Sequence, residues 1–168
     1  KYFQKIKDTT ISDKDWNTKH LGILKNAYAK SEHFQEIFPF LENLYLTCEY
    51  ERISDINFHF ISGICDFLNI KTKLVFSSIY NLSRLEKTDK LIDICIQAGA
   101  KEYVSGPLAK DYIDKDLFDK ANIKLTWMSY DNYPKYSQTY DEFEHKVSII
   151  DVLFNCGEKS IKYITKEK

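Results

Sequence analysis

The sequence predicts an α/β fold with three layers, in which a helical N-terminal half packs on a small parallel sheet. Apolar residues recur at helical spacing through the first 70 residues, and three short apolar runs follow near 73–77, 102–105 and 123–128. Helical patterns separate these three runs. Strands that alternate with helices pair in parallel through right-handed crossovers, so the runs predict a βαβαβ core.

Length and composition predict one domain. The chain has 168 residues, of which 43% are hydrophobic, which is enough for one sizeable core but too little for two ordinary domains. We expect a single α/β domain over 1–168, with 1–70 mainly helical and 71–168 holding the βαβαβ core and the C-terminal helices. The 24 basic and 25 acidic residues nearly cancel, and this balance argues against a nucleic-acid binder.

Three helices are predicted in the first half. Apolar residues on one face indicate a helix over about 13–30, a second over 34–45 and a third over 54–68. Pro39 falls within the second helix and removes a backbone donor, so we expect a kink or a restart there.

The second half alternates between short elements. A helix over 87–98 follows the first predicted strand and should end at Gly99 in a left-handed conformation. One or two short helices precede the third strand. A polar, tyrosine-rich segment over 129–140 predicts an ordered loop, and a last core helix should end at Gly157, followed by a short tail helix.

All three predicted strands end in small polar residues. Ligands bind at the carboxyl ends of strands in open parallel sheets, where hydroxyl groups and backbone amides recognise phosphate or carboxylate. The candidate binding residues are Ser77 and Ser78 after the first strand, Ser105 and Gly106 after the second, and Ser129 after the third. The alternative is that these hydroxyl groups only end strands and cap helices.

Positive charge near this edge comes from Arg84 and Lys87, which fall between the first strand and its crossover helix. Either residue is suited to an anionic substrate, although both are also ordinary solvated loop charges.

His20 and Asp151 are the acid/base candidates. His20 follows Trp16 by four residues on the apolar side of the first helix, and Asp151 lies inside the apolar last helix. Structural roles remain open for both residues: a hydrogen-bonded core histidine and a carboxylate that positions its neighbours.

No metal site is predicted, and the cofactor is left open by the sequence. The cysteines are far apart without a CxxC pair, and the other histidines show no ligand spacing, so reduced thiols are expected. The chain has no GxGxxG, P-loop, GxSxG or HExxH motif. No apolar run approaches the roughly 20 residues that span a bilayer, and the first residues lack a signal-peptide pattern, so we expect a cytoplasmic protein.

The ordered residues resemble the WbqC-like family, whose members are typically encoded among genes for bacterial surface polysaccharide such as O-antigen. The most specific matching stretch is SIIDVLFNCG over 148–157. The other matching stretches are Trp16, 19–21, 27–28, 34–37, 77–78, 87–95, 103–106, Tyr112, 136–138 and Phe143. Family members usually begin with a further segment rich in Gln, Pro and Tyr, so this chain resembles the later two-thirds of such a protein.

The resemblance implies an enzyme that modifies an activated sugar or its amino group, by acyl or aminoacyl transfer. On this reading the substrate is a small molecule, the candidate serines and Gly106 hold its anionic or carbonyl part, and Tyr133 and Gln138 cover the site. A partner enzyme of the polysaccharide pathway is also expected. The alternative is a noncatalytic module that binds a sugar nucleotide or a partner through its tyrosine-rich loop, with residues Tyr130, Tyr133, Tyr136 and Tyr140.

Overall fold

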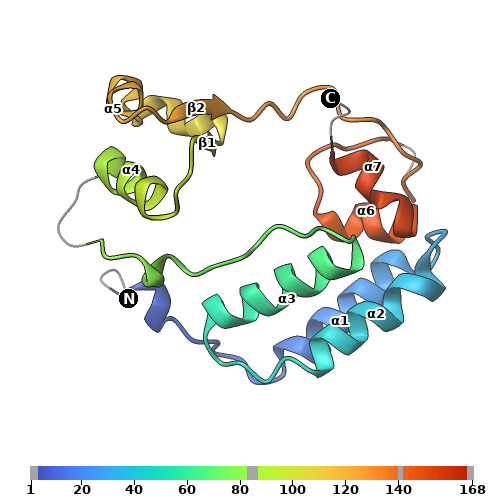
Figure 1. Ribbon diagram of the computed structural model, residues 1–168. Coiled ribbons are helices and arrows are strands. Elements are labelled where there is room, and N and C mark those ends of the chain that lie inside the picture. The colour runs from blue at the N-terminus through green and yellow to red at the C-terminus, as the bar shows by residue number, and fades with distance from the viewer. Residues whose placement is uncertain (1–3, 83–86, 140–141, 166–168) are drawn as a thin grey trace. The chain divides into compact units, whose positions relative to one another are not determined.

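The computed structural model describes residues 4–82, 87–139 and 142–165. The chain divides into two compact units, coloured by residue number in Figure 1. The helical unit consists of residues 1–74 and 133–168, and the sheet unit consists of residues 75–132. The single domain expected over 1–168 stays a prediction.

Three helices of the helical unit lie side by side in Figure 1, close to the ranges predicted for them. They are α1 (Trp16–Tyr28), α2 (Phe34–Leu46) and α3 (Ile53–Phe67). A short 3-10 turn, η1 (Ile6–Asp8), precedes them. The three amphipathic patterns therefore formed helices because each had an apolar face to bury against the others.

Helix α2 continues through Pro39 without a break, so the predicted restart is wrong. A proline inside a helix deprives the carbonyl four residues earlier of its donor. That carbonyl belongs to Gln35, and both Gln35 and Pro39 are exposed. Water can therefore satisfy the carbonyl, and the buried face of the helix is not interrupted.

The last helices of the chain belong to the helical unit. They are α6 (Ile149–Cys156), η4 (Gly157–Ser160) and α7 (Ile161–Ile164). Leu153 and Phe154 of α6 are fully buried against Ile37 and Leu41 of α2, and the rings of Tyr28 and Phe154 stack with centroids 4.5 Å apart. Packing between α2 and α6 therefore forms the centre of this core.

The sheet unit contains two parallel strands, β1 (Glu102–Ser105) and β2 (Lys124–Trp127). Glu102 pairs with Lys124 in the register, and Lys124 Nζ also lies 3.0 Å from a Glu102 carboxylate oxygen. The helices of the unit are α4 (Lys87–Gln97), η3 (Pro107–Asp111) and α5 (Lys115–Lys120). Two of the three predicted strands and their parallel pairing are therefore confirmed.

The strand predicted over 73–77 is wrong. The backbone there is neither helix nor strand until η2 (Ser77–Ile79), and the described sheet has two strands. Val75 is 41% exposed, and the Ile79 amide donates to the Phe76 carbonyl in a tight turn. The end of this apolar run turns instead of pairing with a strand, so the three-layer βαβαβ arrangement is not confirmed.

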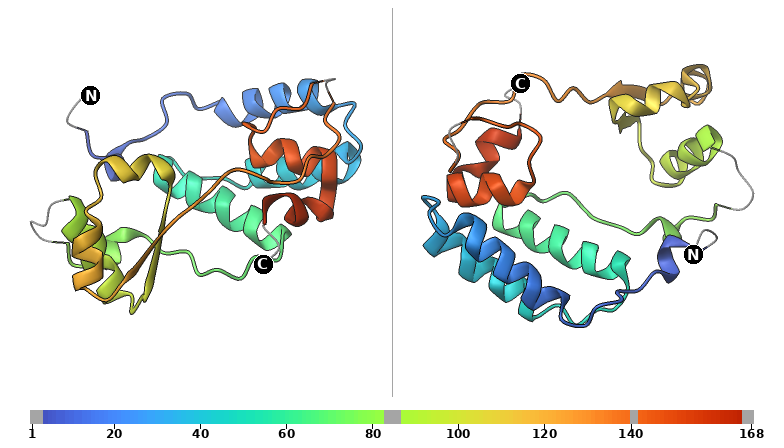
Figure 2. Two further views of the ribbon diagram at one scale, coloured as in Figure 1. Left: turned by 90° about the horizontal axis from the view of Figure 1, so that it is seen from above. Right: turned by 180° about the vertical axis from the view of Figure 1, so that it is seen from behind.

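Figure 2 shows α4 and α5 beside the same face of the two strands. Phe118 of α5 is fully buried, and its ring stacks on that of Tyr103 with centroids 5.4 Å apart. Val104, which points to the opposite face, is 50% exposed. Among the described residues of this unit, helices cover the face that carries Tyr103, whereas parallel strands are usually covered on both faces.

The glycine that ends α4 behaves as predicted. Gly99 has φ +66°, and the Ala100 amide donates to the Cys95 carbonyl at 2.8 Å across the turn. None of the described helices is long and apolar enough to cross a membrane.

Replacing the fully buried phenylalanine of either unit, Phe154 or Phe118, should destabilise the protein. We expect Phe154→Ala and Phe118→Ala each to lower the free energy of unfolding by about 3–5 kcal/mol, because each leaves a cavity. Leu108→Ala is the control, because that side chain is 84% exposed, and it should change stability by less than about 0.5 kcal/mol. Urea titrations followed by circular dichroism would measure this, and equal effects of all three changes would contradict the assigned cores.

Candidate functional site

A carboxylate on α6 organises the loop that precedes the helix. The Ser148 side chain caps α6 by accepting from the Ile150 amide, and Asp151 follows in the first turn. Tyr136 Oη donates to Asp151 Oδ2 at 2.7 Å, and Gln138 Nε2 donates to the same oxygen at 3.1 Å. We call Asp151, Tyr136 and Gln138 the carboxylate cluster; all three are half-buried.

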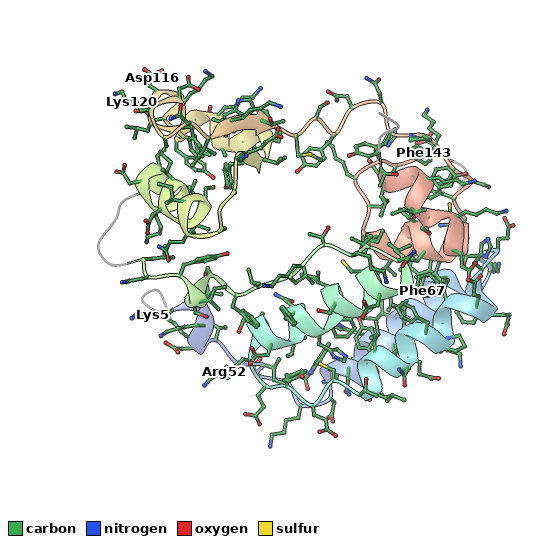
Figure 3. All side chains as sticks on the ribbon, in the orientation of Figure 1. Lys5, Arg52, Phe67, Asp116, Lys120 and Phe143 are labelled. Carbon is green, nitrogen blue, oxygen red and sulfur yellow. The ribbon has the colours of Figure 1, made fainter. Side chains whose placement is uncertain are left out.

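The side chain of Gln138 also closes the loop on itself. Its Nε2 donates to the Glu144 carbonyl at 2.9 Å, and its Oε1 accepts from the Glu144 amide at 2.8 Å. Phe143, labelled in Figure 3, packs edge-on against the Tyr136 ring with centroids 5.2 Å apart. Polar contacts to α6 and aromatic packing thus connect residues 136–139 of this segment to the rest of the helical unit.

The second turn of α6 adds another polar contact to the loop. Asn155 is buried, and its Nδ2 donates to the Asp151 carbonyl at 2.8 Å. Its Oδ1 accepts from Thr139 Oγ1 at 3.3 Å. Asp151 and Asn155 therefore bind adjacent parts of one loop, as their spacing of one helical turn allows.

Burial raises the pKa of the Tyr136 phenol well above its ordinary value, and the hydrogen bond to Asp151 raises it further. The phenol is therefore protonated at neutral pH and acts as a hydrogen-bond donor. Burial, together with the negative charges of Asp151 and Glu32, also raises the pKa of the Cys156 thiol to about 11. Cys156 is thus a neutral thiol near pH 7, without the thiolate that a nucleophile needs.

His33 and Glu36 lie against the C-terminal end of α6. His33 Nδ1 donates to Glu36 Oε2 at 2.9 Å, and the His33 amide donates to the Phe154 carbonyl at 3.0 Å. A Cβ atom at Gly157 would lie 2.4 Å from His33 Nδ1. The sequence reasoning missed this pair because it searched the histidines for metal-ligand spacing; the signal was a spacing of three residues at a helix start.

In the sheet unit, the exits of the two strands meet at one edge. The Met128 amide donates to the Ser105 carbonyl at 2.8 Å, and a Cβ atom at Gly106 would lie 3.6 Å from Tyr130 Oη. Ser129 Oγ, on the same exit of β2, accepts from the Asp131 amide at 3.2 Å. The expected gathering of small polar groups is therefore present at the ends of β1 and β2.

No described hydrogen bond connects Ser77 and Ser78, which follow the first predicted strand, with the edge at the ends of β1 and β2. Ser77 and Ser78 are exposed in η2, and no hydrogen bond of the described residues links either to Ser105. Arg84 lies outside the described residues, and Lys87 is the first residue of α4.

The two predicted acid/base residues are not in contact. His20 is exposed and packs edge-on against Trp16 and Tyr45, with ring centroids 5.4 and 6.1 Å away. No hydrogen bond or ion pair within the described part of the chain joins His20 to Asp151. Tyr133 begins the second segment of the helical unit and is half-buried.

The family can be assigned from the sequence comparison. The WbqC-like protein family matches residues 1–163, and the stretch with the carboxylate cluster and Gly157 lies within this range. This chain belongs to the WbqC-like protein family. The uncharacterized protein Rv1507c of Mycobacterium tuberculosis is 40% identical over 164 residues, which cover 98% of this chain and 71% of that protein. No solved structure matches the chain.

The family match begins at the first residue, and the expected absence of a front segment stays a prediction. In this WbqC-like protein, no three described His, Cys, Asp or Glu residues are grouped so that they could hold a metal ion. The four cysteines are unpaired thiols in this structure; Cys95 and Cys156 are buried, and Cys48 and Cys65 are partly exposed.

Replacing Tyr136 by phenylalanine should flatten the alkaline pH dependence of stability. The folded-state pKa of Tyr136 is raised, so its contribution is fully present below the ordinary tyrosine pKa of 10.0 and is lost as the pH rises above it. We expect Tyr136→Phe to lower stability at pH 7 by about 1–2 kcal/mol and then to lose less stability than the wild type above pH 10.

Urea midpoints at pH 7, 9 and 10.5 would measure the difference. Tyr130→Phe is the matched control, because Tyr130 is 63% exposed. Parallel pH curves for the wild type and Tyr136→Phe would contradict the assignment of a buried phenol.

Proposed function

We propose that this WbqC-like protein acts in the biosynthesis of bacterial surface polysaccharide of the O-antigen type, as a transferase that modifies a nucleotide-activated amino sugar. The transferred group is an acyl or aminoacyl group. Family membership supports the pathway, and the carboxylate cluster supports an enzyme. The observation that carries the proposal is Asp151, held on the most specific family stretch by Tyr136 and Gln138.

Both hydrogen bonds to Asp151 from the loop reach Oδ2. Among the described residues, no hydrogen bond reaches Oδ1, and no buried side-chain oxygen lacks a partner. Oδ1 therefore has no hydrogen bond from the described residues, while its carboxylate is held in place. A carboxylate positioned in this way is suited to hydrogen-bond to an amino group.

Within the sheet unit by itself, the small polar residues at the ends of β1 and β2 stay proposed contacts for an anionic ligand. Ser105 and Gly106 support this role, because β1 and β2 both end at that edge, where ligands bind in open parallel sheets. Lys87 and Arg84 stay proposed sources of positive charge, and Ser77 and Ser78 stay proposed contacts. A cytoplasmic location is part of the proposal, because activated sugars are made there.

A noncatalytic binding module is the second candidate. It is favoured by one observation: the partners of Asp151 both come from the tyrosine-rich loop, so the carboxylate also serves to order that loop. An ordered aromatic loop suits the binding of a sugar nucleotide or a partner enzyme. The two candidates differ in whether product forms when donor and acceptor are both present.

Replacing Asp151 by asparagine tests the catalytic role. We expect Asp151→Asn to reduce product formation by about 10²–10⁴-fold, because the amide keeps the shape and an acceptor oxygen but loses the negative charge that holds the attacking amino group. Nucleotide-activated amino sugars would be incubated with acyl-thioester or aminoacyl donors, and products would be measured by mass spectrometry. Asp66→Asn, an exposed change on α3, is the control.

Wild-type turnover by Asp151→Asn would remove Asp151 from the reaction. Binding of the sugar nucleotide without product from any donor would instead favour the noncatalytic module.

Removing the proposed anion contacts should abolish stabilisation by ligand. We expect nucleotide sugars to raise the melting temperature of the wild type, and Ser105→Ala with Lys87→Ala to lose this shift. Ser12→Ala is a control for hydroxyl loss, because Ser12 is an exposed serine of the helical unit. An unchanged shift in the Ser105 and Lys87 double variant would show that the sheet edge does not bind the ligand.

A further inference from the structure

The ring of His33 is held from two sides at the start of α2. Its Nδ1 donates to Glu36 Oε2 at 2.9 Å, and the backbone amide of the same residue donates to the Phe154 carbonyl at 3.0 Å. The histidine is therefore fixed both to a carboxylate on its own helix and to the backbone of α6. Orientation of an imidazole by a carboxylate on one nitrogen leaves the other nitrogen for chemistry.

Gly157 gives this pair the space that it occupies. The residue has φ +55° and ψ −137°, and a Cβ atom there would lie 2.4 Å from His33 Nδ1 and 2.8 Å from Glu36 Oε2. Both the backbone conformation and the close approach therefore require glycine. The His33–Glu36 contact thus lies directly against the end of the helix that carries Asp151.

The second ring nitrogen of His33 is accessible. The side chain is 25% exposed, and Nε2 lies 3.8 Å from Glu32 Oε1, which is too long for a hydrogen bond. No other described residue hydrogen-bonds to Nε2. This nitrogen therefore has a neighbouring negative charge but no fixed partner.

Helix capping alone does not explain the pair. His33 precedes α2 and Glu36 is its third residue, the spacing of a capping box, in which the glutamate accepts from the backbone amide of the capping residue. Here the His33 amide donates to Phe154 instead, and the Glu36 carboxylate accepts from the imidazole. No side-chain capping hydrogen bond is formed at this end of α2.

We propose that His33, oriented by Glu36, is the general acid/base of the transfer reaction, and that it takes the role that the sequence suggested for His20. This inference rests on the proposed function and deepens it. The groups recorded near the imidazole are Glu36 and Glu32 from its own segment and Gly157 at the end of α6.

The step balances without an added oxidant or reductant. The sugar amino nitrogen attacks the carbonyl carbon of a thioester or aminoacyl ester and forms the C–N bond. His33 Nε2 takes the proton that the nitrogen loses, and returns it to the leaving thiol or alcohol as the carbon–sulfur or carbon–oxygen bond breaks. The products are an amide and the free thiol or alcohol, and the histidine is regenerated neutral.

Activity measurements test the role of His33. We expect His33→Gln to lower kcat by about 10²–10⁴-fold with little change in KM, and added imidazole to restore part of the activity of His33→Ala. Glu36→Gln should lower kcat less, because the amide still holds the ring. His145→Gln, an exposed histidine of the same unit, is the control that should keep wild-type activity. Loss of activity in His20→Gln but not in His33→Gln would overturn the proposal.

A second measurement does not depend on activity. Nitrogen-15 NMR at a pH where the His33 ring is neutral should show that its proton is on Nδ1, and that Glu36→Leu, which removes the acceptor, weakens this preference. A proton on Nε2 in the wild type would overturn the proposal, because the nitrogen facing the substrate could not act as a base. Failure of the wild type to form product with any donor would contradict the proposed function, and the NMR result would then decide the orientation of His33 by itself.

Discussion

The burial of α6 is the constraint on which the helical unit depends. Residues Val152 to Cys156 are all buried, so the helix has almost no face left to solvent beyond its first turn. Its polar groups must therefore find protein partners, because an unpaired polar group in such a place would cost about 1–3 kcal/mol. Tyr136 and Gln138 donate hydrogen bonds to Asp151, and Thr139 donates one to Asn155. The tyrosine-rich loop is ordered because it supplies these partners.

The burial of α6 also fixes polar side chains at both ends of this short helix. The first turn holds the Asp151 carboxylate, fixed by the loop, and the glycine after the last turn adjoins a histidine that hydrogen-bonds to a glutamate. A rigid, buried helix is a better support for such groups than a mobile loop, because the geometry of the groups is set by packing. The family stretch is thus explained in physical terms: its apolar residues form the core, and its polar residues lie where the core meets the loop and α2.

Local patterns predicted most of the helices and their ends. Gly99 and Gly157 were expected to stop helices, and both have positive φ. The run over 73–77 shows the limit, because β propensity does not say whether a neighbouring strand is available, and here the chain turns at η2. Pro39 shows another limit of local patterns, because a proline breaks a helix only where the carbonyl that loses its donor cannot reach water. The Gln35 carbonyl is on the exposed side of α2. The Asp151–Asn155 spacing was visible in the sequence, but the contact of His33 with Gly157 joins distant residues and no local pattern reveals it.

The exposed side of the small sheet has a consequence for how the protein behaves in solution. Each of the two described strands has a single neighbour, so each presents one edge whose backbone groups are available to another chain. The Glu102 and Lys124 pair places charge on that surface, and charges of this kind oppose the stacking of strands from different molecules. Thr126, which pairs with Val104 in the register, also hydrogen-bonds to Glu102, so this side of the two strands is polar around a single exposed valine. Such a surface gives strands of another molecule little apolar area on which to pair.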